Sequence, residues 1–486
     1  MKKQSIDASG IRWAFLSNAA SYITQPIVLI LLARVLTPSD FGLLAMALTV
    51  VTFFELFRDM GLSQALIRQE GNPQELASSA FWTQFVLSIA MFGFVWAIAP
   101  LVGMYYRDLG VVPVLRVMAG LFLLYPFVDI PYAFLLRDLR FRALFLRQGV
   151  PALVGGGISL LLGWTGFGVW SLVVGMLMGR MTAGAVSMWM ARWWPSFRIS
   201  SETISMLRFG SQVSFQKVLG WVIVWLDRWF VGRFLGTASL GVYQVAMRIG
   251  EIPYLASGSP LALVAYPIMA QDSRERADIK RRYLSYLQGV ALIGFPLGIG
   301  MVLIMPFAIP SILGPKWAHS IKVFQVILLY QTLGCIVSLN PEVFKALGKP
   351  EIMSYFFIAR AIISVPVYFF AAQRDIMTLA LAHLVLVLLF APINMFITMR
   401  MVGLKLKQLL LALRSGLIMA VALSLIGLFY WWRGAQVIHS DGVNTALLAV
   451  LLIGVGIFIL RMADAQAFRQ MKRIIIPSLQ AERSEE

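Results

Sequence analysis

The sequence predicts an all-α integral membrane protein with about fourteen transmembrane helices. Hydrophobic residues make up 59% of the 486 positions and charged residues only 13%, whereas a soluble domain carries roughly a quarter charged residues. The apolar residues lie in runs long enough to cross a bilayer, and the basic residues collect in short clusters between those runs. Lipid is therefore the expected solvent for most of the surface.

The first six predicted spans occupy the N-terminal 200 residues. A spanning helix needs about 20 mostly apolar residues, because a rise of about 1.5 Å per residue must cover about 30 Å of hydrocarbon. Segments of this kind lie at 11–35, 40–57, 81–104, 113–136, 146–164 and 167–190. Met1–Gly10 is polar, and no signal-peptide cleavage site follows it, so we expect a retained first span.

A second series of six spans follows, and a final pair ends the predicted set. These segments lie at 209–235, 239–265, 284–309, 319–343, 352–371, 377–399, 412–432 and 443–461. Only helices satisfy every backbone donor in lipid at this length. We expect one bundle in 1–200, a second in 201–405, and two extra helices with a cytoplasmic tail in 406–486.

The loops between spans test this topology, since Lys and Arg collect on the cytoplasmic side. Basic residues crowd alternate loops, namely Arg137, Arg140, Arg142 and Arg147, then Arg192, Arg198 and Arg208, then Arg274, Arg276, Lys280, Arg281 and Arg282, and finally Lys405, Lys407 and Arg414. Both termini are therefore predicted to be cytoplasmic. The net charge of +18 is spread over these loops rather than forming one stripe, so nucleic acid is not an expected partner.

Two parts of the chain are similar to each other at a constant offset of 199 positions. Arg34, Gly42 and Ala47 pair with Arg233, Gly241 and Ala246, and a second similarity pairs Leu115-Arg116-Val117 with Ile321-Lys322-Val323. Six spans separate the first copies, so both halves are expected to insert in the same orientation. A pseudo-two-fold axis along the membrane normal follows from this. The alternative is chance similarity between apolar segments.

Several motifs resemble the polysaccharide transporter family. They include Ala33-Arg34-Val35-Leu36-Thr37-Pro38-Ser39-Asp40-Phe41-Gly42, Asp59-Met60-Gly61-Leu62-Ser63-Gln64-Ala65-Leu66-Ile67-Arg68, Leu226-Asp227-Arg228 and Gly241-Val242-Tyr243. The similarity is strongest to Wzx-type exporters of colanic acid and related exopolysaccharides, within the superfamily of multidrug, oligosaccharidyl-lipid and polysaccharide exporters. The resemblance implies two six-helix bundles around a central cavity, two extra helices and alternating access. It also implies undecaprenyl-diphosphate-linked oligosaccharide as cargo and the bacterial inner membrane as location.

Ionisable residues inside spans are costly and usually face a cavity or a partner, so each is a candidate site residue. Arg248 and Glu251 share one face of the eighth span, either as a phosphate ligand and its neutralising or proton-carrying group, or as a structural ion pair. Arg360 has no acidic residue in its own span, which favours an anionic ligand or a partner elsewhere.

Three further acidic or titratable residues are candidates for ion coupling or gating. Asp227 is adjacent to Arg228, a candidate for cargo binding, in the seventh span. The two point about 100° apart, so one of them is expected to face the cavity; the alternative is a structural contact with a neighbouring helix. Asp129 lies between Pro126 and Pro131, where a broken helix can form; it either couples protonation or pairs with an Arg. His383 titrates near neutral pH or simply packs through a hydrogen bond.

Three arginines lie at predicted span ends. Arg58 closes the second span at the cytoplasmic edge, while Arg34 and Arg233 mark equivalent ends of the two repeats on the opposite side. Each is either a gating or cargo-binding residue or an arginine that extends to the lipid head groups.

The sequence lacks the motifs of the common enzyme classes. It has no Walker phosphate loop, no Gly-x-Ser-x-Gly elbow and no His-Glu-x-x-His pair, and its one cysteine, Cys335, cannot build a thiolate metal site. We therefore expect a flippase for a lipid-linked oligosaccharide, without a bound cofactor but with possible H⁺ or Na⁺ coupling. Its expected partners are membrane lipids and the polysaccharide polymerase and export machinery. The alternatives are a cation-coupled multidrug exporter and a non-transporting polymerase or scaffold.

Overall fold

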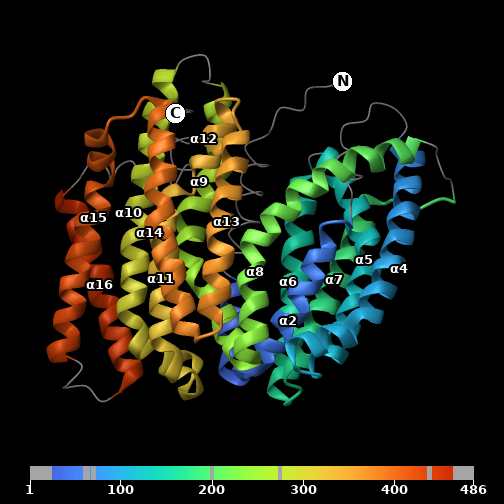
Figure 1. Cartoon of the computed structure of the whole chain (residues 1–486), viewed down its shortest axis with the longest axis horizontal. Helices are drawn as coiled ribbons and strands as arrows, with labels where there is room; N and C mark the ends of the chain where they lie inside the picture. Colours follow the sequence, from blue (N-terminus) through green and yellow to red (C-terminus); the bar gives the residue numbers. More distant parts are fainter. Residues whose placement is uncertain are drawn as a thin grey trace, which may run out of the picture. The chain divides into compact units, whose positions relative to one another are not determined.

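The structure is a computed structural model that describes residues 24–58, 66, 73–138, 140–197, 202–271, 276–434 and 440–463. Every regular element in these ranges is helical and no strand occurs among them, which confirms the predicted all-α class (Figure 1). The N-terminal residues, most of the Asp59–Arg68 motif, part of the loop holding Arg274 and the predicted C-terminal tail lie outside the described residues.

Ten helices in the described ranges are long and apolar enough to cross a membrane, and two shorter apolar helices, Thr24–Val35 and Asp441–Gly456, accompany them. The count of fourteen is therefore not confirmed. The α-helices are α2 Pro38–Glu55, α4 Pro73–Tyr106, α5 Val111–Arg137, α6 Phe141–Trp164, α7 Val169–Ala191, α8 Glu202–Gly250, α9 Ile252–Gln271, α10 Arg276–Ala308, α11 Ile321–Gly334, α12 Asn340–Ala346, α13 Glu351–Ala372, α14 Ile376–Val402, α15 Leu406–Phe429 and α16 Asp441–Ala463.

The chain forms two compact units. Unit 1 comprises Met1–Val245 together with Val365–Ile376, and unit 2 comprises Ala246–Ser364 together with Met377–Glu486. The predicted bundle boundaries at residues 200 and 405 stay predictions.

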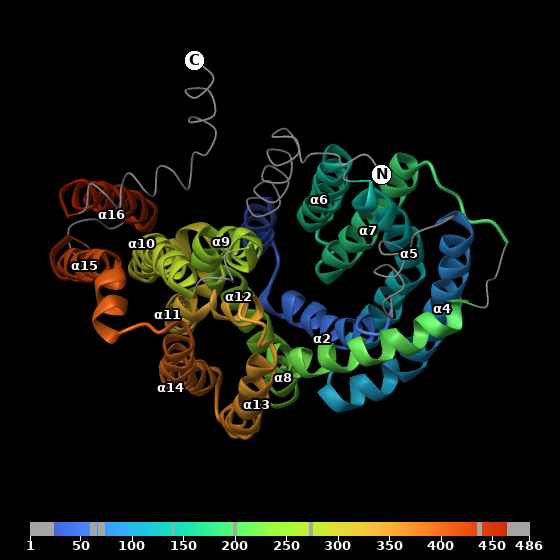
Figure 2. The same ribbon diagram turned by 90° about the horizontal axis from the view of Figure 1, so that it is seen from above.

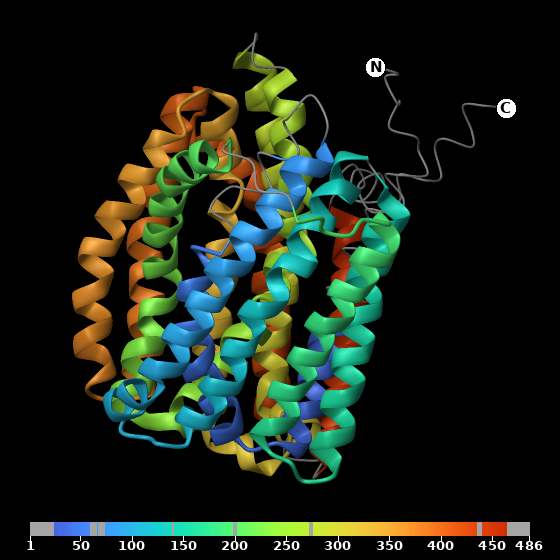
Figure 3. The ribbon, with the colours of Figure 1, turned by 90° about the vertical axis from the view of Figure 1, so that its right-hand side faces the viewer.

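The helices of unit 1 pack side by side, with α5 against α2, α4 and α7, and α6 against α7 (Figures 2 and 3). Small residues bring α6 and α7 together: a β-carbon on Gly155 would lie 2.7 Å from the carbonyl oxygen of Gly175, and one on Gly175 would collide with the Ser159 side chain. Without a hydrophobic force between helices in lipid, such close backbone approach provides the packing energy.

The Thr37-Pro38-Ser39-Asp40 part of the family motif starts helix α2. The Thr37 backbone N–H donates to Asp40 Oδ2 at 2.8 Å, and the Asp40 backbone N–H donates to Thr37 Oγ1 at 3.3 Å. This reciprocal arrangement is a capping box, with Pro38 at the first helical position where its missing N–H costs nothing. The motif therefore has a structural reason independent of any cargo.

The equivalent glycines of the two predicted repeats meet each other in unit 1. A β-carbon on Gly42 would collide with the backbone of Thr237, and one on Gly241 would collide with the carbonyl group of Pro38. Pro38 and Thr237 are again 199 positions apart, so the contact is reciprocal in the repeat numbering. This reciprocity agrees with the repeat that the constant offset predicts.

Predicted spans seven and eight differ from the observed helices at two breaks. Gly236 has φ 79° and ψ −177° and divides α8 into two helical segments; glycine adopts this backbone without steric cost. The predicted eighth span is not one helix, because α8 ends at Gly250 and α9 starts at Ile252. Pro253 lies in the first turn of α9 and has no N–H to donate to the carbonyl group of Ile249, so the helical hydrogen bonds are interrupted across this junction.

Helix α5 runs without a break past Asp129, in agreement with the single predicted span 113–136, although prolines flank that residue. The helix continues from Val111 to Arg137 with both Pro126 and Pro131 inside it. Both prolines are buried, so packing against the neighbouring helices holds the helix together across the missing backbone hydrogen bonds.

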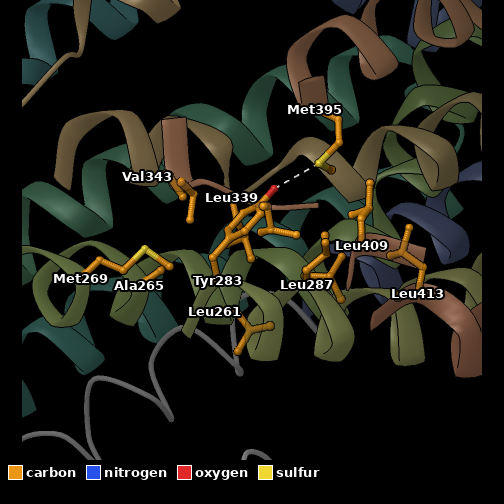
Figure 4. Close-up of a cluster of buried hydrophobic side chains, with 14 of the residues drawn as sticks. Leu261, Ala265, Met269, Tyr283, Leu287, Leu339, Val343, Met395, Leu409 and Leu413 are labelled. Atoms are coloured by element: carbon orange, nitrogen blue, oxygen red, sulfur yellow. Dashed lines mark hydrogen bonds between the residues drawn. The ribbon is translucent and has the colours of Figure 1, made fainter. Parts of the chain in front are cut away.

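Helix α10 is the centre of unit 2 and packs against α9, α11, α15 and α16. In Figure 4, Tyr283 of α10 lies among Leu339 and Leu409, and its hydroxyl group is 3.4 Å from the Met395 sulfur. The same hydroxyl donates to Asn340 Oδ1 at 2.6 Å, and the Asn340 side chain donates to Asn394. This buried polar chain ties α10, α12 and α14 together.

Helix α15 has the surface expected of a lipid-facing span. Leu417, Ile418, Val421 and Leu425 are each between 42% and 64% exposed, whereas Leu423 packs with Leu303, Leu448 and Leu452 in the contact among α10, α15 and α16. Apolar side chains exposed over a whole helix face need a lipid environment. The chain is thus a multi-pass membrane protein.

Candidate functional site

Charged and aromatic side chains from α2, α4, α5, α6 and α7 gather inside unit 1. We call this group the Arg58–Asp129 cluster. Its members are Glu55, Arg58, Gln84, Tyr125, Asp129, Tyr132, Arg147 and Arg180. Some members are neighbours on one segment, such as Glu55 and Arg58, but the cluster as a whole extends from Glu55 to Arg180 in the sequence. The packing of α2, α4, α6 and α7 around α5 brings these segments together.

Asp129 accepts two contacts from different segments. Arg58 Nε lies 3.3 Å from Asp129 Oδ2, and Gln84 Nε2 donates to the same oxygen at 3.0 Å. The Asp129 side chain is 9% exposed and that of Arg58 is 27% exposed. Two residues that the sequence identified separately therefore form one ion pair, which agrees with the structural alternative for Asp129.

The ring of Tyr125 connects the acidic and basic members of the cluster. Its hydroxyl donates to Glu55 Oε1, while the guanidinium carbons of Arg58 and Arg180 lie 4.3 Å and 4.9 Å from the ring centroid. Glu55 also interacts electrostatically with both arginines. Tyr125 is fully buried, so it holds these groups at fixed positions.

Arg147 is the member with spare hydrogen-bonding capacity. Its guanidinium carbon lies 3.8 Å from the Tyr132 ring centroid, and its Nε is buried without a hydrogen-bond partner. A buried unpaired donor is costly, so its presence indicates either a ligand or a changing partner. The Gln84 Oε1 atom is likewise buried without a partner.

The cluster carries an excess of positive charge. Three guanidinium groups, those of Arg58, Arg147 and Arg180, face two carboxylates, those of Glu55 and Asp129. Guanidinium groups bind phosphate oxygens with paired hydrogen bonds. The arrangement can therefore compensate the charge of a bound anion. An arginine that moves from a carboxylate to the anion changes the ion pairs within the cluster.

Asp227 and Arg228 form a second charged group of unit 1, which we call the Asp227 network. Arg228 Nη1 lies 3.2 Å from Asp227 Oδ1, Arg228 Nε donates to Gln244 Oε1 at 2.9 Å, and the Tyr243 hydroxyl donates to Asp227. Asp227 and Arg228 are 2% and 5% exposed. Contrary to the expected divergence of adjacent side chains, the two pair with each other and with neighbouring residues of one segment.

Arg248 and Glu251 lie at the break between α8 and α9 in unit 2. Arg248 Nη1 is 3.5 Å from Glu251 Oε2, and the two side chains are 50% and 33% exposed. The pair predicted from their spacing is therefore present, in a half-exposed position where an added anion can compete for the arginine.

Arg360 keeps an unsatisfied donor in α13. Its Nε atom is buried without a hydrogen-bond partner, and so is the Oγ atom of Ser364 one helical turn later. Residues four apart share a helix face, so a guanidinium and a hydroxyl donor lie side by side there. Ser364 was not identified from the sequence.

The remaining predicted residues are dispersed. His383 is buried, and its ring centroid lies 5.0 Å from that of Tyr330 in unit 2. Arg233 lies 5.5 Å from the Tyr105 ring centroid, and Arg34 is exposed at the end of its helix. Arg58 is the only one of the three edge arginines that lies in the Arg58–Asp129 cluster.

No group of His, Cys, Asp and Glu side chains that could hold a metal ion occurs among the described residues. The charged groups described above consist of arginines and carboxylates together with tyrosine, glutamine and serine side chains.

Sequence reasoning missed Arg147 and Arg180 as site residues. Arg147 falls within the predicted span 146–164 but is counted there with the basic residues of the preceding loop; α6 starts at Phe141 and includes it. Arg180 lies inside α7 with no acidic residue in that helix, the same signal that identified Arg360. Applying that rule to every span would have found it.

Comparison with known proteins identifies related chains. Residues 31–322 match the family described as "Polysaccharide biosynthesis protein". The teichuronic acid biosynthesis protein TuaB of Bacillus subtilis (strain 168) is 23% identical over 71% of this chain and 72% of its own length. The succinoglycan biosynthesis transport protein ExoT of Rhizobium meliloti (strain 1021) is 25% identical over 72% of each chain. The lipopolysaccharide biosynthesis protein WzxC of Escherichia coli (strain K12) is 20% identical over 70% of this chain and 68% of its own length.

Two kinds of solved structure share the fold. The lipid II flippase MurJ in an inward closed conformation matches with a TM-score of 0.70 over 92% of this chain and 98% of that chain, at 13% identity. An inward-facing multidrug resistance MATE family transporter matches with a TM-score of 0.61 over 78% of this chain and 94% of that chain, also at 13% identity.

Proposed function

Because the chain belongs to the polysaccharide biosynthesis protein family, whose match covers more than half of its length, we propose that it flips undecaprenyl-diphosphate-linked oligosaccharide repeat units across the bacterial inner membrane. The product serves exopolysaccharide or lipopolysaccharide synthesis. Curated relatives of this chain include a protein named for succinoglycan transport. The chain is a transporter and not an enzyme.

The observation that carries the proposal is the excess of guanidinium groups in the Arg58–Asp129 cluster, together with the unpaired Nε of Arg147. A diphosphate entering the membrane needs its charge compensated, because low dielectric makes an unpaired charge very costly. Arg147 and Arg180 bind the diphosphate in our proposal, and Arg58 exchanges between Asp129 and the cargo. A second phosphate contact in unit 2 comes from Arg360 with Ser364, assisted by Arg248.

Alternating access moves the diphosphate head and its sugar while the lipid tail stays in the bilayer. Without a nucleotide-binding motif, the energy comes from an H⁺ or Na⁺ gradient, the membrane potential or the cargo gradient. Asp129 is the proposed coupling residue because it alternates between Arg58 and an ion; Glu251, half-exposed beside Arg248, is a second candidate. The Asp227 network and His383 serve as framework.

The proposed topology places both termini and the arginine-rich loops in the cytoplasm. This puts Glu55 and Arg58, at the end of α2, near the cytoplasmic surface where the cargo is loaded. The proposed partners are membrane lipids and the polymerase and export machinery that receive the cargo on the other side.

The same fold also carries multidrug exporters, so the charge of the site decides between the two functions. A cation exporter needs a mainly acidic site. Here Arg228 is fully paired and Arg248 is paired, but Arg360 and Arg147 keep unpaired donors, and three arginines face two carboxylates in the cluster. The described groups therefore favour an anionic cargo.

The test of the function is deletion of the gene in its host. We expect loss of one capsule or exopolysaccharide and accumulation of its lipid-linked repeat unit on the cytoplasmic side, with restoration by the wild-type chain. Normal polymer in the deletion strain would contradict the proposal, as would transport of cationic drugs without any change in polymer.

The second phosphate contact is tested by the double variant R248A/R360A in the complemented strain. We expect export to fall about tenfold or more, since each removed charge-assisted hydrogen bond is worth about 1.5 kcal/mol or more. The exposed arginine Arg414 of α15 provides the matched control R414A. Full export by the double variant would remove both residues from the site.

A further inference from the structure

An open groove of about 560 Å³ lies between helices α10 and α15 of unit 2. The residues that line it are Lys280, Arg281, Leu284, Ser285, Gln288, Gln408, Leu411 and Ala412. They occupy the first turns of the two candidate spans Ile279–Leu313 and Leu406–Trp432. The groove therefore lies where the apolar part of both helices begins, at the level of the membrane surface.

One turn further into the membrane, the backbones of the two helices are in close contact. At that level a β-carbon on Gly416 would collide with the carbonyl group of Ala291. Larger residues follow toward the membrane surface, with Gln288 and Leu284 on α10 and Gln408 on α15. Beneath them, Leu287, Leu409 and Leu413 belong to the hydrophobic core that Figure 4 shows.

The lining of the groove offers hydrogen-bond donors and positive charge. Lys280 Nζ donates to the Gly403 carbonyl at 3.0 Å, which leaves two of its three hydrogens for another acceptor. Gln408 Oε1 accepts from the Lys405 backbone N–H at 3.1 Å, so the amide nitrogen of Gln408 remains the available end. None of the eight described lining residues is acidic, and α15 contains no carboxylate.

The apolar part of the lining continues into the lipid-facing surface. Leu411 is 54% exposed, and the exposed Leu410 and Leu417 lie on the same helix. A ligand here must combine a charged head with an apolar body, because the polar donors and the leucines alternate along the same groove. Free phosphate or a soluble peptide would leave the leucines uncovered.

We propose that the groove between α10 and α15 binds the phosphate head group of an anionic phospholipid, such as phosphatidylglycerol. Lys280 and Arg281 bind the phosphate oxygens, and Ser285, Gln288 and Gln408 bind the glycerol and ester oxygens. Leu284 and Leu411 cover the start of the acyl chains. Basic grooves between membrane helices recognise anionic head groups in this way. The bound lipid holds the ends of α10 and α15 together.

The test is native mass spectrometry of the full-length protein in detergent, titrated with phosphatidylglycerol and, separately, with phosphatidylcholine. The variant K280Q/R281Q removes both charges of the groove. The matched control K407Q/R414Q removes two exposed charges of α15 that do not line it. A third variant, A412W, fills the groove without changing the charge.

We expect phosphatidylglycerol to bind K280Q/R281Q about twenty-five-fold more weakly than the wild type, at about fivefold per charge. A412W should lose most of the binding, and K407Q/R414Q should keep it. If the double variant fails to fold, A412W alone still tests the groove. Equal losses in K280Q/R281Q and K407Q/R414Q would overturn the proposal, as would unchanged binding in A412W or equally tight binding of phosphatidylcholine.

The same measurement separates a phospholipid site from a cargo site. Undecaprenyl diphosphate added in competition should leave phosphatidylglycerol on the groove at equal concentration. If undecaprenyl diphosphate displaced the phospholipid from the wild type, and if its own binding were lost in the K280Q/R281Q variant, the groove would be a cargo site and the proposal would be overturned. The outcome does not depend on the transport function, because binding is measured without transport.

Discussion

The two charged groups of unit 1 differ in how completely their charges are paired. In the Asp227 network one carboxylate meets one guanidinium, both are nearly fully buried, and Tyr243 and Gln244 complete the hydrogen bonds. In the Arg58–Asp129 cluster three guanidinium groups meet two carboxylates, Arg58 is partly exposed, and Arg147 keeps an unpaired donor.

This difference teaches that a charged residue inside a span does not by itself indicate a binding site. Both groups satisfy the rule that intramembrane charges find partners. A neutral, saturated pair has no capacity left for a ligand, and removing either partner leaves a buried charge. An unbalanced, partly exposed group can exchange partners. We therefore assign a structural role to the Asp227 network and cargo binding to the Arg58–Asp129 cluster.

The largest expected effect comes from removing the carboxylate of the saturated pair, Asp227. We expect D227L to destabilise the protein by roughly 3 to 5 kcal/mol, because the buried Arg228 loses its partner. The measurement is thermal unfolding in detergent, followed by intrinsic fluorescence. The double variant D227L/R228M, which removes both charges, should recover much of this loss. Equal stability of D227L and wild type would show that Arg228 is not confined to this pair.

Substitution in the unbalanced group should affect transport far more than stability. We expect R147Q to lower transport of the lipid-linked cargo about ten- to a hundredfold in reconstituted vesicles, because a charge-assisted contact of about 1.5 to 3 kcal/mol is lost. Its stability should fall by only about 0.5 to 1 kcal/mol, because the contact with the Tyr132 ring is lost but Arg147 Nε has no hydrogen-bond partner to lose. K407Q, at an exposed position of α15, is the control. A variant that unfolds early but transports normally would reverse our assignment of the two groups.

A smaller effect should separate coupling from simple pairing at Asp129. D129N keeps an acceptor for Gln84 but loses the ion pair with Arg58, and we expect transport to fall roughly fivefold, the equivalent of about 1 kcal/mol. The remaining transport should no longer respond to an imposed H⁺ or Na⁺ gradient. Stimulation equal to that of the wild type would remove Asp129 from the coupling mechanism.

The smallest effect concerns the aromatic support of Arg147. Y132L removes the ring that lies 3.8 Å from the Arg147 guanidinium carbon, and we expect a loss of about 0.5 to 1 kcal/mol in stability. Y132F keeps the ring and should behave as the wild type in the same unfolding measurement. If Y132F were as unstable as Y132L, the hydroxyl and not the ring would be the important group.

The fold class could be predicted from the sequence because apolar run length is a strong signal in lipid. The start of α2 and the family motif Thr37-Pro38-Ser39-Asp40 were also readable, since the capping box depends on local spacing. The junction at Glu251 could not be predicted from the sequence, because hydropathy is averaged over a window that spans the break between α8 and α9. Hydropathy did predict one continuous span over 113–136, and α5 runs unbroken from Val111 to Arg137 through Pro126 and Pro131.

The candidate site was only partly predictable. Arg58 and Asp129 were each identified, but their pairing is 71 positions apart in the sequence and depends on how α2 packs against α5. Arg180 lies in a span without an acidic residue, which is the signal that singled out Arg360. Arg147 lies inside the predicted span 146–164, but its place beside Arg137, Arg140 and Arg142 favours a loop position in the sequence, whereas α6 includes it. Whether a charged side chain finds all its hydrogen-bond and ion-pair partners depends on contacts between helices. The spacing of residues within one helix does not predict those contacts.

The reciprocal meeting of Gly42 and Gly241 has a mechanical consequence. The two helix backbones approach each other so closely there that neither glycine has room for a β-carbon. A side chain at either position would have to push α2 and the second segment of α8 apart. Because the two contacts are adjacent, one such substitution would open the crossing at both glycines.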